Sequence, residues 1–409
     1  MTRDIRNKAS AEGADGGSPV FLLAAAEPSG DQLGAALIDG LRSINPNTKF
    51  IGCGGEAMAA RGFRSEFRID ALGVFGPVDS FRVVPAALRM AARLKRLAEQ
   101  NRPQCAVLID SWAFSELVVN KIRAASPKTA LVKYVTPQVW ASRPGRADRL
   151  ARKFDYAMTV LPFEPEIFHK LGLPADYVGN PIFQAAAARK GDAATFRARR
   201  NLGSRPALLI LPGSRRGELR RLLPVYRGAV ARLANRIHGL AVFMAPAPNV
   251  ASLARELIAD WPTPPVLIEA EEKHDAIAAA NAALATSGTV TTELALAGAP
   301  MVVAYKIGPL AAPIVRHFLE AKYVTIMNIL LDREAAPEFL QEKCRPELIA
   351  DSLFALLTNE KLRNAQIAAQ AEFSRRLELG DAPAGLRAAR ALSDYLESRE
   401  RKSAEPVRP

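Results

Sequence analysis

The side chains best suited to chemistry gather in three turns, each between an apolar run and a helical pattern. The first turn is EPSGD (27–31), which follows the apolar run VFLLAAA (20–26). The turn lacks the G-x-G-x-x-G pattern of a dinucleotide-binding fingerprint. It is not a P-loop either, because no G-K-[ST] follows it. Two carboxylates would repel a phosphate, so the turn either caps the following helix or handles a hydroxyl or an amine. Asp31 suits the first alternative, as an N-cap.

The second and third turns have the features of phosphate-binding loops. PGSR (212–215) follows one strand pattern, and SGT (287–289) follows another. A helix N-terminus offers free amide groups and the positive end of the helix dipole to an anion. The forked guanidinium of Arg215 suits phosphate oxygens, and the small residues around Gly288 let the backbone approach a diphosphate closely.

A carboxylate completes this pattern. Glu293 lies one turn into the helix that follows SGT and could reach the hydroxyl pair of a ribose. Two phosphate-type turns with a nearby carboxylate predict a site for a nucleotide-sugar donor. The alternatives are a solvated basic helix around Arg215 and simple helix N-caps at Ser287 or Thr289. A cap and a phosphate site are compatible.

The first half of the chain carries carboxylates at its strand ends instead. Transfer of a sugar to a hydroxyl acceptor requires a general base near the acceptor. Glu27 follows the first apolar run, and Asp110 follows the run CAVLI. Ligands of open α/β sheets bind beyond the carboxyl ends of the strands. Asp110 ends a buried strand at that edge and is therefore the preferred base, with Glu27 as second choice.

Short β-rich runs alternate with amphipathic helical patterns, which is typical of βαβ units whose parallel sheet is covered by helices on both faces. The alternation stops over a charged, small-residue segment at 185–206 and then restarts, so we place a domain boundary near 190–205. The predicted strands are 20–26, 49–53, 106–110, 130–135, 156–161, 207–211, 240–244, 266–268, 282–286 and 301–305, and the predicted helices include 32–41, 85–98 and 116–125.

This order predicts an α/β architecture of the GT-B type, with two doubly wound Rossmann-like domains that face a cleft and a helical C-terminus. No stretch approaches the roughly 18 apolar residues that span a bilayer. The N-terminus is polar and lacks the apolar core of a signal peptide, so a cytoplasmic protein is expected. The predicted parts are a disordered lead-in at 1–17, a first domain at 18–190, a second at 205–345 and C-terminal helices at 346–399.

The net charge of the chain limits the classes of partner that it could bind. There are 55 Lys and Arg against 42 Asp and Glu, a net charge of +13, which suits nucleic acid, an anionic membrane surface or phosphorylated substrates. The basic residues are dispersed and no nucleic-acid-binding motif is visible, so no nucleic acid partner is expected. The 3 cysteines are far apart and predict free thiols in a reducing compartment. The 4 histidines show no metal-ligand spacing, so no metal site is expected.

One segment suits a membrane surface. Arg89, Arg93 and Arg96 recur at i, i+4 and i+7 and share one helix face, a pattern that usually marks a packed surface helix with a solvated basic side. The preceding VFGPVDSFRVV (74–84) is apolar and loop-like, and apolar residues beside arginines suit an acyl-chain substrate at a membrane. The predicted acyl or membrane contacts are Val78, Phe81, Val84, Arg89 and Arg93.

Six motifs occur in order: AAAEPSGDQLGAAL, YVTPQVWASRPGRA, LPFEPEIF, LPGSRRGEL, SGTVTTELALAGAPMVVAYK and MNILLDREAAPEFLQEKC. Together they resemble the lipid-A-disaccharide synthase family over roughly residues 18–395. The resemblance implies an inverting enzyme that joins a UDP-2,3-diacylglucosamine donor to a 2,3-diacylglucosamine 1-phosphate acceptor, with no metal or other cofactor. It also implies peripheral attachment to the cytoplasmic face of the inner membrane. The C-terminal helices would cross over and could exchange between the subunits of a homodimer.

The motif match also assigns individual residues. The UDP-binding positions are Arg215, Ser287, Gly288, Thr289, Glu293 and Asn328, and the catalytic or acceptor-side positions are Asp110, Glu27, Ser29, Gly30 and Asp31. The sequence departs from the usual family pattern at Pro28, Trp112, Ala113, Ser142, Asn180 and Met327, mostly in the first domain. A paralogue with a different acceptor and a non-catalytic protein that binds a nucleotide sugar are therefore open alternatives.

Overall fold

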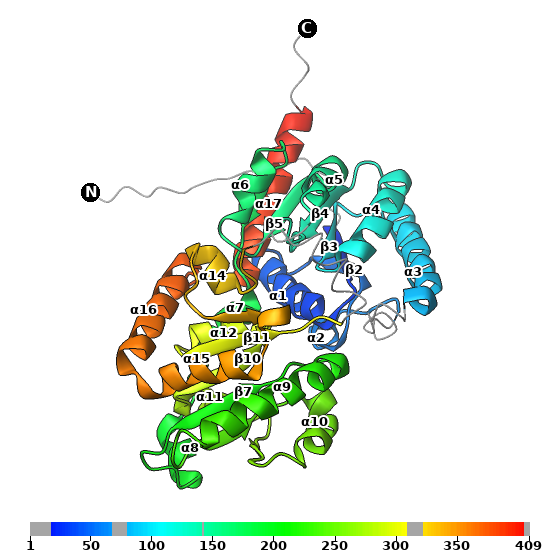
Figure 1. Cartoon of the computed structure of the whole chain (residues 1–409). Helices are drawn as coiled ribbons and strands as arrows, with labels where there is room; N and C mark the ends of the chain where they lie inside the picture. The colour runs from blue at the N-terminus through cyan, green and yellow to red at the C-terminus, as the bar shows by residue number, and fades with distance from the viewer. Residues whose placement is uncertain (1–17, 68–79, 141–142, 309–321, 405–409) are drawn as a thin grey trace, which may run out of the picture.

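The computed structural model describes residues 18–67, 80–140, 143–308 and 322–404. They form two parallel six-stranded sheets, each flanked by helices (Figure 1). The strand order is β2-β1-β3-β4-β5-β6 in the first sheet and β12-β11-β10-β7-β8-β9 in the second. Strand order therefore reverses between β1 and β3 in the first sheet and between β7 and β10 in the second. These are the two topological switch points, where ligands of such sheets bind.

The first domain contains six strands and the helices between them. The strands are β1 (Val20–Ala25), β2 (Lys49–Cys53), β3 (Cys105–Ile109), β4 (Ala130–Tyr134), β5 (Tyr156–Thr159) and β6 (Ala175–Tyr177). The helices are α1 (Pro28–Ile44), α2 (Glu56–Ala59), α3 (Ser80–Asn101), α4 (Trp112–Ala125), α5 (Gly145–Lys153) and α6 (Glu164–His169), followed by the connecting helices α7 (Pro181–Ala188) and α8 (Ala193–Arg199).

The second domain repeats the alternation and continues into the C-terminal helices. Its strands are β7 (Ala207–Leu211), β8 (Ala241–Met244), β9 (Val266–Leu267), β10 (Ala282–Thr286), β11 (Met301–Tyr305) and β12 (Glu338–Leu340). Its helices are α9 (Arg216–Ala234), α10 (Ala251–Ile258), α11 (Lys273–Ala279), α12 (Thr289–Leu296) and α14 (Ile326–Leu331). The chain then forms α15 (Pro346–Thr358), α16 (Glu360–Arg376) and α17 (Ala384–Ala404).

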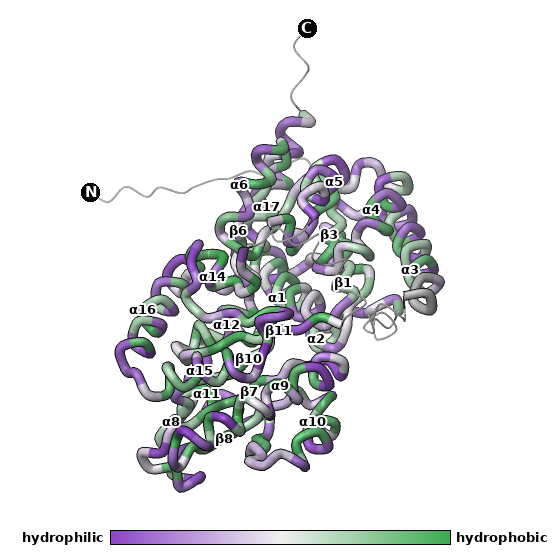
Figure 2. The backbone as a smooth tube through the Cα atoms, in the orientation of Figure 1, coloured by the Kyte–Doolittle hydropathy of each residue, from purple (hydrophilic) through white to green (hydrophobic). Residues whose placement is uncertain are grey.

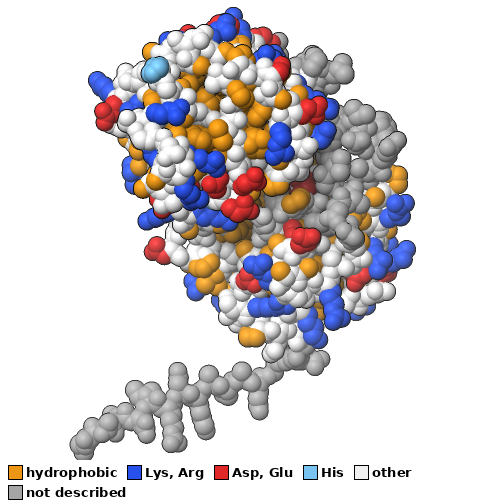
Figure 3. Space-filling view, turned by 90° about the horizontal axis from the view of Figure 1, so that it is seen from below, with side chains coloured by type: hydrophobic (Ala, Val, Ile, Leu, Met, Phe, Trp, Pro, Cys, Tyr) orange, Lys and Arg blue, Asp and Glu red, His pale blue; other side chains and the backbone are white. Residues whose placement is uncertain are grey.

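Apolar residues concentrate in the strands and on the inner faces of the helices (Figure 2). Leu22 and Leu23 point to opposite faces of β1, and both are buried in separate clusters. Both faces are apolar because helices cover both, as is usual for parallel sheets. Viewed from below, the lysine and arginine side chains lie in several separate groups (Figure 3), in agreement with their dispersal along the sequence.

Helix α17 returns to the first domain and packs along α1 (Figure 1). The two helices approach closely because glycines face each other at the crossing. A Cβ added at Gly40 would lie 2.2 Å from the carbonyl oxygen of Gly385, and one at Gly385 would lie 2.1 Å from that of Ala36. The predicted crossover is therefore present within a single chain.

The predicted strands are confirmed to within two residues at each end, but two short strands and the helix within the predicted linker were not predicted. The strands β6 and β12 have three residues each, too short for a recognisable alternation. The predicted linker at 185–206 contains helix α8, whose Phe196 is buried in the core of the second domain. Helix α3 begins at Ser80, five residues before the predicted start at Pro85, so residues 80–84 are helical and not loop-like.

Candidate active site

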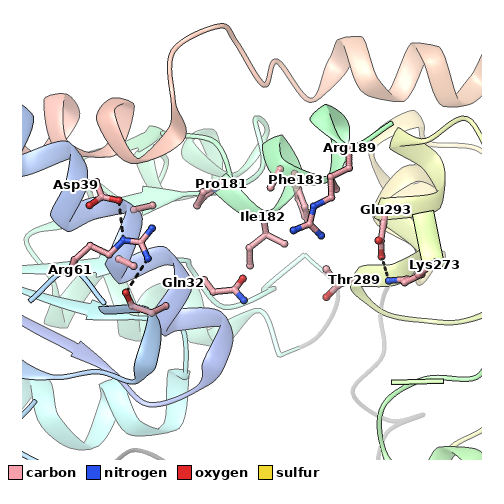
Figure 4. Close-up of a pocket in the computed structure, with 15 residues that line it drawn as sticks. Gln32, Asp39, Arg61, Pro181, Ile182, Phe183, Arg189, Lys273, Thr289 and Glu293 are labelled. Atoms are coloured by element: carbon pink, nitrogen blue, oxygen red, sulfur yellow. Dashed lines mark hydrogen bonds and ion pairs between the residues drawn. The ribbon is translucent and has the colours of Figure 1, made fainter. Parts of the chain in front are cut away.

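Most of the predicted site residues lie at the two switch points. A cavity of about 540 Å³ opens beyond the ends of β7 and β10 and is lined by both phosphate-type turns. An adjoining cavity of about 430 Å³ lies between the two domains (Figure 4). The two cavities share Arg189, Lys273, Thr289 and Glu293. The proposed donor turns therefore open toward the first domain.

The turn after β7 places Arg215 at the mouth of the cavity. Gly213 has φ of 95°, and a Cβ there would lie 2.7 Å from Oε2 of Glu218 and 2.9 Å from Cγ2 of Thr286. The turn therefore requires glycine. Arg215 is the N-cap residue of α9, and its side chain is 76% exposed. Its Nη1 donates to the buried Glu218 at 3.2 Å, so the guanidinium is held beside the cavity but remains accessible to a ligand.

The turn after β10 exposes backbone at the N-terminus of α12. Gly288 has φ of 153° and ψ of −165°, a conformation that is essentially restricted to glycine. A Cβ added there would meet no atom within 4 Å, so this face of the turn is open to a ligand. Gly288 itself is the N-cap residue, with no side-chain hydrogen bond to the first turn. The simple alternative of a Ser287 or Thr289 cap is therefore not what the structure contains.

Glu293 lies on the wall shared by the two cavities (Figure 4). Its Oε2 accepts from Nζ of Lys273 at 2.6 Å, and its Oε1 lies 3.5 Å from Nδ1 of His274. Desolvation lowers the pKa of His274, against the opposing effect of the Glu293 charge. The carboxylate is thus fixed by a cation one helix away and is oriented toward the site.

Asn328 is the predicted donor residue that lines neither of the two cavities. It is buried, and its amide nitrogen donates to Ala336 O and to Glu338 Oε1, both at 2.8 Å. Its oxygen accepts from the amide groups of Ala335 and Ala336 at 2.8 and 2.9 Å. In this structure Asn328 ties α14 to the segment before β12.

The acceptor-side residues meet at the other switch point. The Ser29 hydroxyl donates to Oδ2 of Asp110 at 2.5 Å. Gly30 permits this approach, because a Cβ there would lie 3.3 Å from Cβ of Asp110. Asp110 has φ of 56°, a left-handed conformation that costs of the order of 1–3 kcal/mol. Its backbone N–H donates to Tyr134 O at 2.9 Å. Glu27 is the N-cap residue of α1, without a side-chain capping bond.

Asp31 is a cap, but of a different helix from the one expected. The sequence predicts an N-cap of the following helix, whereas Asp31 lies in the first turn of α1 and is buried. Its carboxylate accepts from the amides of Gly55, Ala57 and Met58 at 2.7, 2.8 and 3.1 Å. It therefore caps α2 through a tertiary contact, and its oxygens are engaged by the protein itself.

Lys133 is a residue of this site that sequence reasoning missed. It lies in β4 and is fully buried, and its Nζ donates to the carbonyl oxygens of Leu108, Asp110 and Tyr134. Burial lowers the pKa of its ammonium group to about 7, while the charges of Asp110 and Glu27 oppose that shift. The available signal was a single lysine in the apolar run ALVKYV.

Glu164 is a second buried group that the sequence analysis did not single out. It accepts from the indole of Trp140 at 3.1 Å and from the amides of Val160 and Leu161 at 3.2 and 3.0 Å. Desolvation raises its pKa to about 7, and these hydrogen bonds oppose the rise. Glu164 thereby fixes Trp140, which packs against the core of the second domain.

The helix with the arginine face is packed as predicted. Ala91, Leu94 and Ala98 of α3 are buried in the core, whereas Arg89 and Arg93 are exposed and Arg93 pairs with Glu66 at 2.9 Å. Of the predicted acyl contacts, Val78 and the side chains of Phe81 and Val84 lie outside the described residues. Across the described ranges there is no group of three or more His, Cys, Asp or Glu side chains that could hold a metal ion. The helices described are all too short or too polar to cross a membrane.

Solved structures of low sequence identity share this fold. A putative UDP-N-acetylglucosamine 2-epimerase from Listeria monocytogenes has a TM-score of 0.63 at 12% identity, with 93% of this chain and 97% of that chain covered. An α,α-trehalose 6-phosphate synthase from Burkholderia multivorans has a TM-score of 0.58 at 13% identity, with 96% and 99% covered. These likenesses concern the fold alone. Together with the two sheets and their switch points, they define a GT-B-like protein of two Rossmann-like domains.

Sequence comparison identifies the family. The family model described as Lipid-A-disaccharide synthetase matches residues 21–389. A lipid-A-disaccharide synthase from Rhodospirillum centenum is 38% identical over 383 residues, 93% of this chain and 95% of that protein. One from Paramagnetospirillum magneticum is 40% identical over 381 residues, 92% and 97% respectively. The chain belongs to the lipid-A-disaccharide synthetase family and is a glycosyltransferase, which confirms the resemblance carried by the six motifs.

Proposed function

We propose that this protein transfers the sugar of UDP-2,3-diacylglucosamine to 2,3-diacylglucosamine 1-phosphate and releases UDP. The observation that carries the proposal is the division of the site between the two switch points. Both glycine turns line the cavity of the second domain, and the carboxylates of Glu27 and Asp110 follow the strands β1 and β3 of the first. The negatively charged diphosphate would thereby bind at the glycine turns of one domain. The acceptor hydroxyl, which must lose a proton, would lie beside the carboxylates of the other.

On the donor side, the backbone at Gly288 and the guanidinium of Arg215 bind the diphosphate. Backbone amides at a helix N-terminus and a forked cation both stabilise the charge that develops as UDP leaves. Glu293 accepts hydrogen bonds from the ribose hydroxyls, and Lys273 holds that carboxylate in place at 2.6 Å.

On the acceptor side, Asp110 acts as the general base. It takes the proton of the acceptor hydroxyl as the new glycosidic bond forms on the opposite face from the leaving UDP, which inverts the anomeric centre. The Ser29 hydroxyl holds Oδ2 at 2.5 Å, so Oδ1 is the oxygen available to the acceptor. Lys133 fixes the peptide of Asp110, because its Nζ donates to the carbonyl oxygen of that residue.

We further propose peripheral attachment to the cytoplasmic face of the inner membrane, through the segment before α3 and its first turns. Its support is the exposure of Arg89 on the same helix and the apolar residues Val78, Phe81 and Val84. Serine at these three positions should weaken sedimentation with anionic vesicles, and salt should weaken it further. Unchanged sedimentation of the triple variant would mean that these residues belong to the core.

The experiment that tests the proposed reaction is UDP release from UDP-2,3-diacylglucosamine, measured with and without the acylated acceptor. Release that depends on the acceptor supports the proposal. Release with other hydroxyl acceptors only would favour a paralogue with different specificity. Tight UDP binding with no release under either condition would favour a non-catalytic nucleotide-sugar-binding protein. That alternative is open because Ala113 stands where the family pattern usually has a second carboxylate after Asp110.

A further inference from the structure

The cavity of about 430 Å³ between the two domains lies beside both halves of the proposed site (Figure 4). In the second domain it is lined by Thr289, which directly follows Gly288 of the donor turn. In the first domain it is lined by Gln32, which lies one helical turn along α1 from Ser29, whose hydroxyl donates to Asp110. A sugar whose diphosphate is bound at Gly288 would therefore have this cavity beside it.

The middle of this cavity is apolar. Helix α7 packs against α1 of the first domain and against α12 of the second, and it supplies much of the wall. The apolar lining includes Ala35, Ala36, Ala57, Pro181, Ile182 and Ala186. Ile182 and Ala186 are only half-buried, so the cavity leaves apolar surface in contact with water. Apolar walls with a few polar groups at the edge are typical of a ligand site.

The charged side chains of the cavity lie at its two ends and form ion pairs there. At one end Nε of Arg61 lies 3.1 Å from Oδ2 of Asp39, and at the other Nζ of Lys273 lies 2.6 Å from Oε2 of Glu293 (Figure 4). Arg189 is at the same end as the second pair (Figure 4). The apolar stretch runs between these ends, which suits a ligand that is apolar along its length.

We propose that this cavity binds one acyl chain of the donor sugar. The inference rests on the proposed function, because it takes the donor to be a diacylated UDP-sugar with its diphosphate at Gly288. An apolar cavity of about 150 Å³ accommodates benzene, so about 430 Å³ is room for a chain of roughly ten carbons or more. The chain enters beside Thr289 and runs along α7. Each methylene that it buries should tighten donor binding about fourfold.

The test measures, by calorimetry without acceptor, the binding of UDP-2,3-diacylglucosamine that carries butanoyl, hexanoyl or octanoyl chains. The parent protein should bind the octanoyl donor about tenfold or more tightly than the butanoyl donor. Ala186→Asp puts a charge on the apolar wall, and Ala186→Phe fills the cavity without a charge. Both should remove this difference and leave the affinity for UDP within about twofold. Ala188→Asp and Ala188→Phe change an exposed residue of α7 that lines neither cavity, and they should keep the difference.

A preference for the octanoyl donor that persists in both Ala186 variants, at unfolding temperatures near that of the parent, would overturn the inference. A parent protein whose affinity does not rise with chain length would overturn it as well. So would Ala186 variants in which the acylated acceptor, and not the donor, loses its dependence on chain length. Since binding is read without turnover, failure of the proposed reaction is seen separately, as the absence of disaccharide from a parent protein that binds the donor series as predicted.

Discussion

Replacement of Arg215 by alanine should weaken UDP binding about 10- to 150-fold. Arg215 is held beside the donor cavity by Glu218 at 3.2 Å, with its side chain 76% exposed. Hydrogen bonds from a guanidinium to a charged oxygen are worth about 1.5–3 kcal/mol, and each 1.4 kcal/mol is a factor of about ten in the dissociation constant. Uridine, which has no phosphate, should bind the parent and the variant equally.

The same substitution has a second effect that must be separated from the first. Glu218 is buried, and it would lose its guanidinium partner, so Arg215→Ala should also lower the unfolding temperature. The double variant Arg215→Ala/Glu218→Gln should recover stability without recovering UDP affinity. Arg220→Ala, an exposed charge further along α9, is the matched control. Isothermal titration that finds UDP bound to Arg215→Ala as tightly as to the parent would refute this account of the donor site.

Three other predictions concern the remaining parts of the site. Gly288→Val should abolish measurable UDP binding, because the side chain enters the open face of the turn, whereas Gly298→Val, at a φ of 70° beyond α12, should not. Asp110→Asn should lower turnover 10²–10⁴-fold, while its UDP affinity stays within a few-fold of the parent's. A near-normal rate of Asp110→Asn together with an inactive Glu27→Gln would assign the role of general base to Glu27. In the folded protein the pKa of Lys133 is lowered to about 7, so above that pH the unfolded chain holds one more proton than the folded protein. From pH 7 toward pH 10 the unfolding temperature of the parent should therefore rise relative to that of Lys133→Met. Parallel pH profiles of the two proteins would contradict that assignment.

The two glycine turns of the second domain could be located from the sequence because their signals are local. A strand, a glycine turn and a helix start are contiguous in SGT (287–289), and the same is true of PGSR (212–215). The topology then brings the two turns together, as expected for neighbouring strands β7 and β10.

The contacts that the sequence did not reveal are tertiary. Asp31 caps a helix 24 residues away from it, and no local pattern links the two. Lys133 was hidden because a single polar residue in an apolar run does not identify its three carbonyl partners. The short strand β12 has too few residues for periodicity, and its pairing with β11 is what defines it.

Formation of the disaccharide is the most direct test of the central claim. Purified protein is incubated with UDP-2,3-diacylglucosamine and 2,3-diacylglucosamine 1-phosphate, and the products are followed by mass spectrometry and by anomeric NMR couplings. We predict one β-linked disaccharide 1-phosphate for each UDP released, and no product from Asp110→Asn on the same timescale. UDP release without disaccharide, or an α-linked product, would contradict the account.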